Sequence, residues 1–226
     1  MKKNFCLLLI STLIILTAVC TFSVYDKDYV IYSCSVEKKW IALTFDDGPH
    51  PYRTAEILDI LKEYGVKATF FVIGENVDLY PELVRREIAE GHEIGNHTAT
   101  HTSLLKADRS ILEKELIPLE KHIKEKFGYD VSLIRPPGGQ LNENVISYAK
   151  EKDQKIILWS VDTMDWAHTP TDDILSNIKK NISDGGIILF HDYVTGKSPT
   201  PDALRSIIPH LISQGYEFVT VSQLIK

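Results

Sequence analysis

After residue 39, short apolar runs alternate with longer segments whose apolar residues recur at helical spacing. This alternation predicts repeated β–α units, which fold as a parallel sheet with right-handed crossovers. The apolar runs are continuous, as expected for strands that are covered on both faces. We expect strands at 40–45, 68–73, 92–95, 131–134, 155–160, 187–190 and 216–220, and helices at 54–64, 81–90, 107–127, 142–152, 171–182 and 201–213.

Seven parallel strands are compatible with two α/β architectures. One is an open doubly wound sheet, and the other is a closed or nearly closed (β/α) barrel. The chain has 226 residues, enough for one domain with a well-buried core. No internal repeat or low-complexity segment divides residues 39–226, so we expect a single domain there.

The N-terminal stretch differs from the rest of the chain. Two lysines at its start precede an uncharged apolar run over residues 5–24. Such a run predicts export, with residues 1–24 acting as a signal peptide or as a retained membrane anchor. We expect residues 25–38 to be a linker, and the protein to lie outside the cell or at its surface.

Composition excludes several classes of protein. The net charge of −6 provides no basic surface for nucleic acid. Two of the three cysteines lie in the leader, so Cys34 has no partner for a disulfide in the domain. Cys20 is a poor lipidation site, because bulky Val19 precedes it. The loop after the first strand carries carboxylates where a dinucleotide site would need glycines.

Chemically reactive side chains follow the expected strands. Because parallel strands bring their C-terminal ends to one edge, the loops that carry these side chains should converge on a single site. The residues are Asp46 and Asp47 after the first strand, His97 and His101 after the third, Arg135 after the fourth, Asp162, Asp165 and Trp166 after the fifth, and His191 and Asp192 after the sixth.

The histidine pair suggests a metal site. His97 and His101 are four residues apart, so they would share one face on a helical turn. Two imidazoles and one carboxylate make a three-ligand set with an open position, as in catalytic zinc sites. Asp46 or Asp47 could supply the carboxylate, and the other could act as a base towards water. The alternatives are a surface Asp-Gly-Pro turn and a chance pair of histidines.

Other positions suit acyl-transfer chemistry. Arg135 could keep a nearby aspartate ionised and oriented. Gly138 allows a backbone N–H to approach a ligand closely, as an oxyanion site requires. His191 could act as a general acid oriented by Asp165, or it could be a hydrogen-bonded core histidine.

Five segments appear in the order and spacing of the polysaccharide deacetylases, carbohydrate esterase family four. They are 44–49 (TFDDGP), 97–101 (HTATH), 135–139 (RPPGG), 162–166 (DTMDW) and 189–192 (LFHD). The resemblance covers about residues 38–226. It implies a distorted (β/α) barrel, often with seven strands, in agreement with the number of strands expected from the pattern.

The resemblance also implies a role for each matching residue. Asp47, His97 and His101 would bind a divalent metal, usually zinc, with cobalt or another divalent ion as alternatives. Asp46 would be the general base and Arg135 would tune it, whereas His191, oriented by Asp165, would protonate the leaving amine. The backbone N–H of Gly138 would help to stabilise the oxyanion, and Trp166 and Leu189 would form groove walls.

One position departs from the family pattern. The family often has tyrosine where this chain has Gly138, so a backbone donor is kept and a groove wall is lost. We therefore expect a wider or differently shaped groove and an altered substrate preference.

The function implied is metal-dependent hydrolysis of N-acetyl groups on a cell-wall glycan such as peptidoglycan, with release of acetate. Chitin oligomers or another amide substrate are alternatives. A catalytically silent glycan-binding or signalling domain on the same fold is an alternative from another class. The expected partner is an N-acetylated glycan, with no nucleic acid, and the sequence indicates no protein partner.

Overall fold

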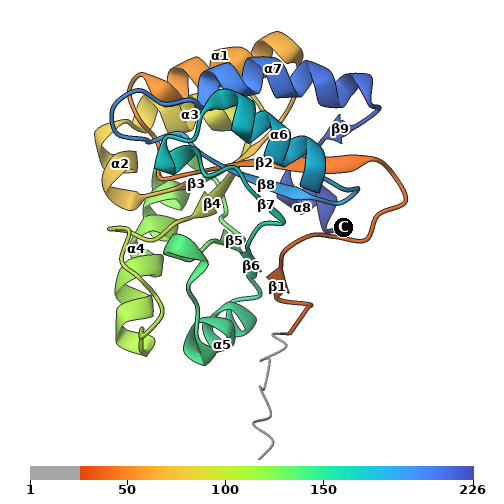
Figure 1. The fold of residues 1–226 in the computed structure, drawn as a ribbon. Coiled ribbons are helices and arrows are strands. Elements are labelled where there is room, and N and C mark those ends of the chain that lie inside the picture. The colour runs from red at the N-terminus through yellow and green to blue at the C-terminus, as the bar shows by residue number, and fades with distance from the viewer. Residues whose placement is uncertain (1–25) are drawn as a thin grey trace, which may run out of the picture.

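The computed structural model describes residues 26–226 (Figure 1). The signal peptide or anchor that we expect over residues 1–24 lies outside the described residues. In the part of the chain that is described, no helix combines the length and the apolar character needed to cross a bilayer.

Nine strands of the described chain form one parallel sheet in the order β1-β6-β5-β4-β3-β2-β8-β7, with β9 paired to the start of β2. With β1 and β7 at its two ends, the sheet curls into a half-barrel, so the expected α/β fold with a distorted barrel is confirmed. The strands are β1 (Val30–Ile31), β2 (Trp40–Asp46), β3 (Thr69–Val72), β4 (Glu93–Asn96), β5 (Leu133–Ile134), β6 (Lys155–Ile157), β7 (Val161–Asp162), β8 (Ile187–His191) and β9 (Glu217–Phe218).

Helices pack outside the curled sheet in two groups. In Figure 1, α1, α3, α6 and α7 lie on the side of β2 and β8, whereas α4 and α5 lie beside β4, β5 and β6. One cluster of buried apolar side chains lies under the first group and also includes Leu119 and Ile123 of α4. A second cluster lies under α4 and α5. The helices are α1 (Arg53–Tyr64), α2 (Gly74–Leu79), α3 (Pro81–Ala89), α4 (Arg109–Phe127), α5 (Glu143–Glu151), α6 (Thr171–Asn181), α7 (Thr200–Ser213) and α8 (Val221–Leu224).

Strand β2 lies at the centre of the core and leads directly into the site. It pairs with β3 on one side and with β8 on the other. Successive side chains of a strand point to opposite faces. Ile41, Leu43 and Phe45 therefore join the core under the helices. Thr44 and Asp46 are also buried, and they point to the other face, into the curl of the sheet.

The segment expected to be a linker takes part in the fold. β1 pairs in parallel with β6, and Val30 is buried. The backbone N–H of Cys34 donates to the carbonyl of Gly185 at 2.9 Å. A strand of two residues is too short to produce a readable hydrophobic period, which is why the sequence pattern does not reveal it. The folded part of the chain therefore begins before residue 39.

Other differences concern element boundaries. The strand expected over 155–160 is divided into β6 and β7, and β7 pairs with β8. The strand expected over 216–220 is reduced to β9. The long helix expected over 107–127 is confirmed as α4, and Asp108 caps it by accepting a hydrogen bond from the Ile111 N–H at 2.9 Å.

Helix α3 carries a carboxyl group into the core. Glu87 is completely buried, and neither of its carboxyl oxygens has a hydrogen-bond partner. Burial, together with the nearby carboxyl of Asp192, raises the pKa of Glu87 well above its usual range. An acid with a raised folded-state pKa ionises first in the unfolded chain. The folded state therefore loses stability as the pH rises from the unfolded-state pKa to the folded-state pKa. Glu87 therefore destabilises the fold increasingly as the pH rises.

We expect Glu87→Leu to raise the free energy of unfolding by about 1 kcal/mol or more, because it removes buried polar atoms that have no partner. The gain in unfolding free energy should increase with pH, since the parent loses stability as the pH rises towards the raised pKa of Glu87. Urea unfolding at mildly acidic and mildly alkaline pH measures both effects. Glu82→Leu, at an exposed position of the same helix, is the control. A Glu87 variant less stable than the parent would contradict this account.

Candidate active site

The C-terminal ends of the strands bring the reactive side chains together. Asp46 and His191 are the last residues of β2 and β8, and they face each other in register. His97 follows β4 directly, and Arg135 follows β5. A pocket of about 350 Å³ opens at this edge. Its lining residues are Asp46, Asp47, His97, His101, Gly138, Trp159, Asp162, Trp166, Leu189 and His191.

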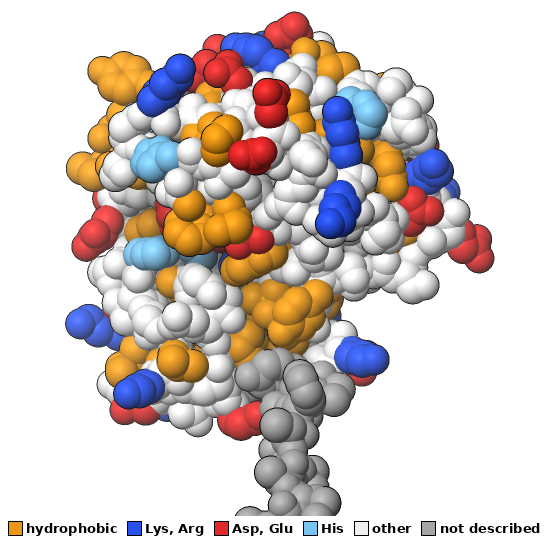
Figure 2. Space-filling model, viewed as in Figure 1, with side chains coloured by type: hydrophobic (Ala, Val, Ile, Leu, Met, Phe, Trp, Pro, Cys, Tyr) orange, Lys and Arg blue, Asp and Glu red, His pale blue; other side chains and the backbone are white. Residues whose placement is uncertain are grey.

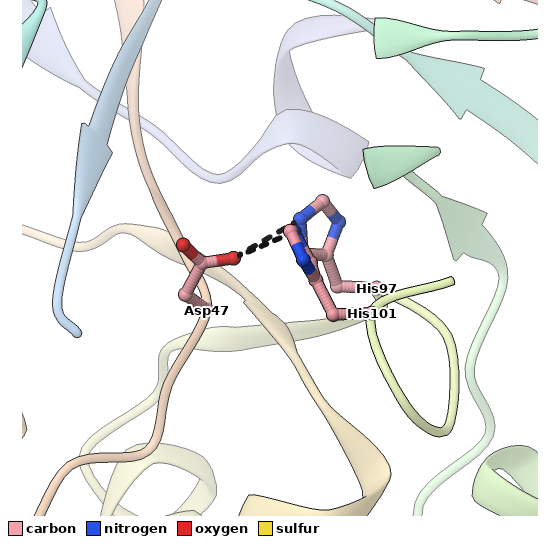
Figure 3. A group of neighbouring side chains, drawn as sticks. All are labelled: Asp47, His97 and His101. Carbon is pink, nitrogen blue, oxygen red and sulfur yellow. Dashed lines mark ion pairs between the residues drawn. The ribbon is translucent and has the colours of Figure 1, made fainter. Parts of the chain in front are cut away.

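Asp47, His97 and His101 form a cluster that could hold a metal ion. One ligand atom from each residue lies within 4.8 Å of the other two. Asp47 Oδ1 is 3.4 Å from His97 Nε2 and 3.2 Å from His101 Nε2, as the dashed lines in Figure 3 mark. Among the described residues this is the one group with the composition and spacing of a metal site.

The chemistry of this cluster fits a divalent cation. Asp47 Oδ1 is buried without a hydrogen-bond partner, as expected of an oxygen atom that serves as a metal ligand. His97 Nδ1 lies 2.7 Å from the carbonyl oxygen of Arg135, so Nδ1 carries the proton and Nε2 is left free to bind. Although burial opposes it, contacts with His101 and His97 hold the pKa of Asp47 well below its usual range. The same contact with Asp47 raises the pKa of His101.

The two histidines lie on a loop and not on the helical turn that their spacing suggested. Thr98 and His101 have positive φ values of 73° and 59°, which break the helical path. Buried Glu115 of α4 holds the loop, because its backbone carbonyl accepts the Ala99 N–H at 2.7 Å and its carboxylate accepts the Thr100 N–H at 3.1 Å. Tertiary hydrogen bonds therefore replace helical periodicity in bringing the imidazoles together.

A buried ion pair lies behind the metal cluster. Arg135 is fully buried, and its Nη1 donates to Asp46 Oδ1 at 2.8 Å. Three protein oxygens satisfy the rest of the guanidinium: Thr44 Oγ1 at 2.8 Å and the carbonyls of Ile157 and Leu158 at 3.0 and 3.1 Å. Burial lowers the pKa of Arg135, although Asp46 opposes the shift.

This pair orients Asp46 towards the pocket. Oδ1 is held by Arg135, whereas Oδ2 lies 3.7 Å from His97 Nε2 and so faces the metal cluster. Sequence reasoning did not identify Thr44, which shares the Nη1 donor with Asp46. Its position two residues before Asp46 on the same strand face is the signal that could have found it.

A second carboxylate–imidazole pair closes the other side of the pocket. Asp165 is buried, and its Oδ1 lies 2.8 Å from His191 Nδ1. Asp165 also accepts hydrogen bonds from the His191 backbone N–H at 2.8 Å and from Thr200 Oγ1 at 2.6 Å. Burial alone would lower the pKa of His191, but the hydrogen bond and the charge of Asp165 raise it to about 9. Asp165 therefore favours the protonated form of His191.

The pocket walls are largely apolar. Leu189 and Trp166 line it as expected, and Trp166 is 51% exposed. Trp159 also lines the pocket, and it packs against two of the buried apolar clusters. Gly138 has φ of 61°, and a Cβ there would meet only the Gln140 side chain, at 3.7 Å or more. A Cβ at this position would fit, but a residue other than glycine would strain the backbone.

Some histidines lie outside the site. His92 is buried, its Nδ1 accepts the Ala68 N–H at 3.2 Å, and burial lowers its pKa to about 4. His122 pairs with Asp78 at 3.2 Å. These histidines make structural contacts away from the pocket.

Comparison with known proteins assigns the family. Residues 34–157 match the family model described as polysaccharide deacetylase. The chain is 42% identical over 200 residues to a peptidoglycan-N-acetylglucosamine deacetylase of Bacillus cereus, covering 88% of this chain and 93% of that protein. It is 36% identical over 196 residues to a chitooligosaccharide deacetylase of Bradyrhizobium, covering 81% and 90% of the two proteins.

Solved structures agree. The crystal structure of a peptidoglycan N-acetylglucosamine deacetylase in complex with 4-naphthalen-1-yl-N-oxidanyl-benzamide superimposes with a TM-score of 0.84 at 40% identity, over 87% of this chain and 92% of that one. The family match extends over just over half of the chain, from residue 34 to residue 157. Together with the full-length relatives, it establishes that this chain belongs to the polysaccharide deacetylase family.

Proposed function

We propose that this chain removes N-acetyl groups from the N-acetylglucosamine-type sugars of peptidoglycan in a metal-dependent hydrolysis that releases acetate. The observation that carries the proposal is the division between two neighbouring carboxylates. Asp47 contacts the two histidines, and Asp46 contacts Arg135. One strand end thereby provides both a metal ligand and a base.

Asp47, His97 and His101 would hold a divalent cation. When bound, the cation supplies Lewis-acid activation of water and of the amide carbonyl. Two imidazoles and one carboxylate suit zinc, with cobalt or another divalent ion as alternatives. Three protein ligands leave room for water and substrate, as catalytic sites require.

Asp46 would accept the proton of the attacking water at Oδ2. This oxygen faces the pocket because Arg135 holds the other one. A buried guanidinium beside a carboxylate favours its ionised form and fixes its direction. The base is therefore positioned before the substrate binds.

His191 would protonate the leaving amine. Its Nδ1 is directed to Asp165, so the proton on Nε2 is the one available to the pocket. The backbone N–H of Gly138 would help to stabilise the oxyanion of the tetrahedral intermediate. Trp166 and Leu189, together with Trp159, would form the walls against which the sugar and its acetyl group pack.

Peptidoglycan is proposed as the substrate because relatives with that named activity are similar over most of their length. The likeness to a chitooligosaccharide deacetylase supports chitin oligomers as the alternative. Gly138 leaves the groove open on one side, which favours a bulky polymeric substrate. We further propose that residues 1–24 export the domain as a signal peptide or retain it at the membrane.

Asp46→Asn should reduce acetate release from peptidoglycan by about a hundredfold or more, because the amide cannot accept a proton. Metal content, measured by atomic emission on the purified protein, should equal that of the parent, since Asp46 is not a ligand. Asp162→Asn, in the same pocket, is the control. An Asp46 variant that keeps parental turnover would remove it as the base.

His101→Ala should lose bound metal and activity together, because one of three ligands is removed. Isothermal titration with Zn²⁺ after chelation, followed by acetate release from peptidoglycan and from chitin oligomers, measures both. His168→Ala, an exposed histidine outside the cluster, should behave as the parent. Parental zinc affinity in the His101 variant would refute the ligand set.

The alkaline limb of the kcat/KM profile should report His191, whose pKa is raised to about 9. Asp165→Asn should move this limb to lower pH, because the carboxylate that stabilises the imidazolium is lost. A bound cation lowers the His191 pKa in both proteins, so they are compared at the same metal loading.

Asp162→Asn should leave that alkaline limb in place, because the Asp162 carboxylate binds the Met164 N–H and not the imidazole. An unchanged limb in the Asp165 variant would mean that another group donates the proton.

A further inference from the structure

A second surface hollow lies on the loops that leave the two catalytic strands. Its lining residues are His50, Tyr52, Arg53, Tyr193, Val194, Thr195 and Gly196. The loop after β2 carries His50, three residues beyond Asp47. The loop after β8 carries Tyr193, two residues beyond His191. At about 3.8 Å between successive Cα atoms, Tyr193 lies within about 8 Å of His191 along the backbone.

The hollow has an aromatic floor. His50 packs edge-on against Tyr193, with ring centroids 4.7 Å apart, and lies 6.0 Å from the ring of Tyr52. Tyr52 is 77% exposed and Tyr193 is 38% exposed, so neither ring is buried in the core and both can contact a ligand. Exposed tyrosine rings offer an apolar face and a polar rim, which matches the alternating C–H and O–H surface of a sugar ring.

The floor is held rigidly. His50 Nδ1 accepts the backbone N–H groups of Tyr52 at 3.2 Å and Arg53 at 3.1 Å, which leaves the proton on Nε2. The His50 backbone N–H donates to Thr54 Oγ1 at 2.7 Å. Thr54 Oγ1 in turn donates to Asp192 Oδ2 at 2.5 Å, and so joins the β2 loop to the end of β8. A preorganised surface loses less entropy when it binds a ligand.

Charge favours a glycan over a metal or a strongly anionic ligand. The one cation in the hollow, Arg53, is already paired with Glu56 at 3.1 Å. Figure 2 shows hydrophobic side chains at the surface near the middle of the face drawn, with histidine side chains to their left. The lining of the hollow is thus aromatic and hydrogen-bonding, and has little excess charge.

We propose that this hollow is a second sugar subsite, in which Tyr193 and Tyr52 stack on a neighbouring residue of the glycan strand whose N-acetyl group occupies the catalytic pocket. The inference rests on the proposed function, and it adds a determinant of substrate length. Short oligosaccharides would fill only the catalytic pocket, whereas longer ones would reach both. The subsite therefore favours polymer over small fragments.

The test compares substrates of two lengths in the full-length protein. Tyr193→Ala and Tyr52→Ala should each lower kcat/KM for acetate release from an N-acetylglucosamine hexamer by about fivefold, as expected for the loss of one ring contact. Turnover of the dimer should stay at the parental value. Tyr193→Phe should retain hexamer activity, because the ring is kept. Tyr32→Ala, an exposed tyrosine beside β1, is the matched control.

The outcomes separate this inference from the proposed function. Equal effects on dimer and hexamer, or no effect on either, would overturn the subsite while the deacetylase activity stands. If the parent releases no acetate from any glycan, the affinity for the hexamer is measured by calorimetric titration instead. Parental affinity in both alanine variants would then overturn the subsite. A loss confined to peptide-bearing peptidoglycan would assign the hollow to the stem peptide and refute the sugar assignment.

Discussion

The buried contact between Arg135 and Asp46 is the interaction on which the site depends. A guanidinium with no exposure to solvent is tolerable only if its charge is paired and its N–H groups are satisfied. Asp46, Thr44 and carbonyls from β6 and the loop beyond it meet that need, so three strands must hold their positions for the pair to exist. The carbonyl of the same arginine also fixes the tautomer of His97. One residue thereby orients the proposed base through its side chain and a proposed metal ligand through its backbone.

The neighbouring carboxylates Asp46 and Asp47 are separated in role by backbone geometry. Asp46 ends a strand and points into the curl of the sheet, whereas Asp47 has φ of 76° and turns towards the histidine loop. Asn76 Nδ2 donates to the Asp47 carbonyl at 2.7 Å and holds this turn. Asp46 thereby pairs with Arg135 and Asp47 with the two histidines, which relieves the repulsion between the neighbouring carboxylates.

The pair of Asp165 and His191 follows the same logic at the opposite wall of the pocket. Asp165 accepts hydrogen bonds from His191 and from two threonines, so its carboxylate is fully engaged although it is buried. Burial opposes charge on the imidazole, and the adjacent carboxylate more than offsets that effect. The proposed base and the proposed acid therefore stand on opposite sides of one pocket, as acid–base hydrolysis of an amide requires.

The sequence by itself determined the β–α alternation, the placement of reactive residues at strand ends, and the five motifs that resemble one family. It did so because burial on both faces of a parallel sheet leaves a readable apolar pattern, and because catalytic residue types are rare enough to be noticed. Only the tertiary structure decided that β1 joins the sheet, that the His97–His101 loop is not helical, and that Thr44, Thr163 and Thr200 support the charged pairs. Those contacts join residues up to 144 positions apart, and hydrogen bonds at such separations leave no local period in a chain.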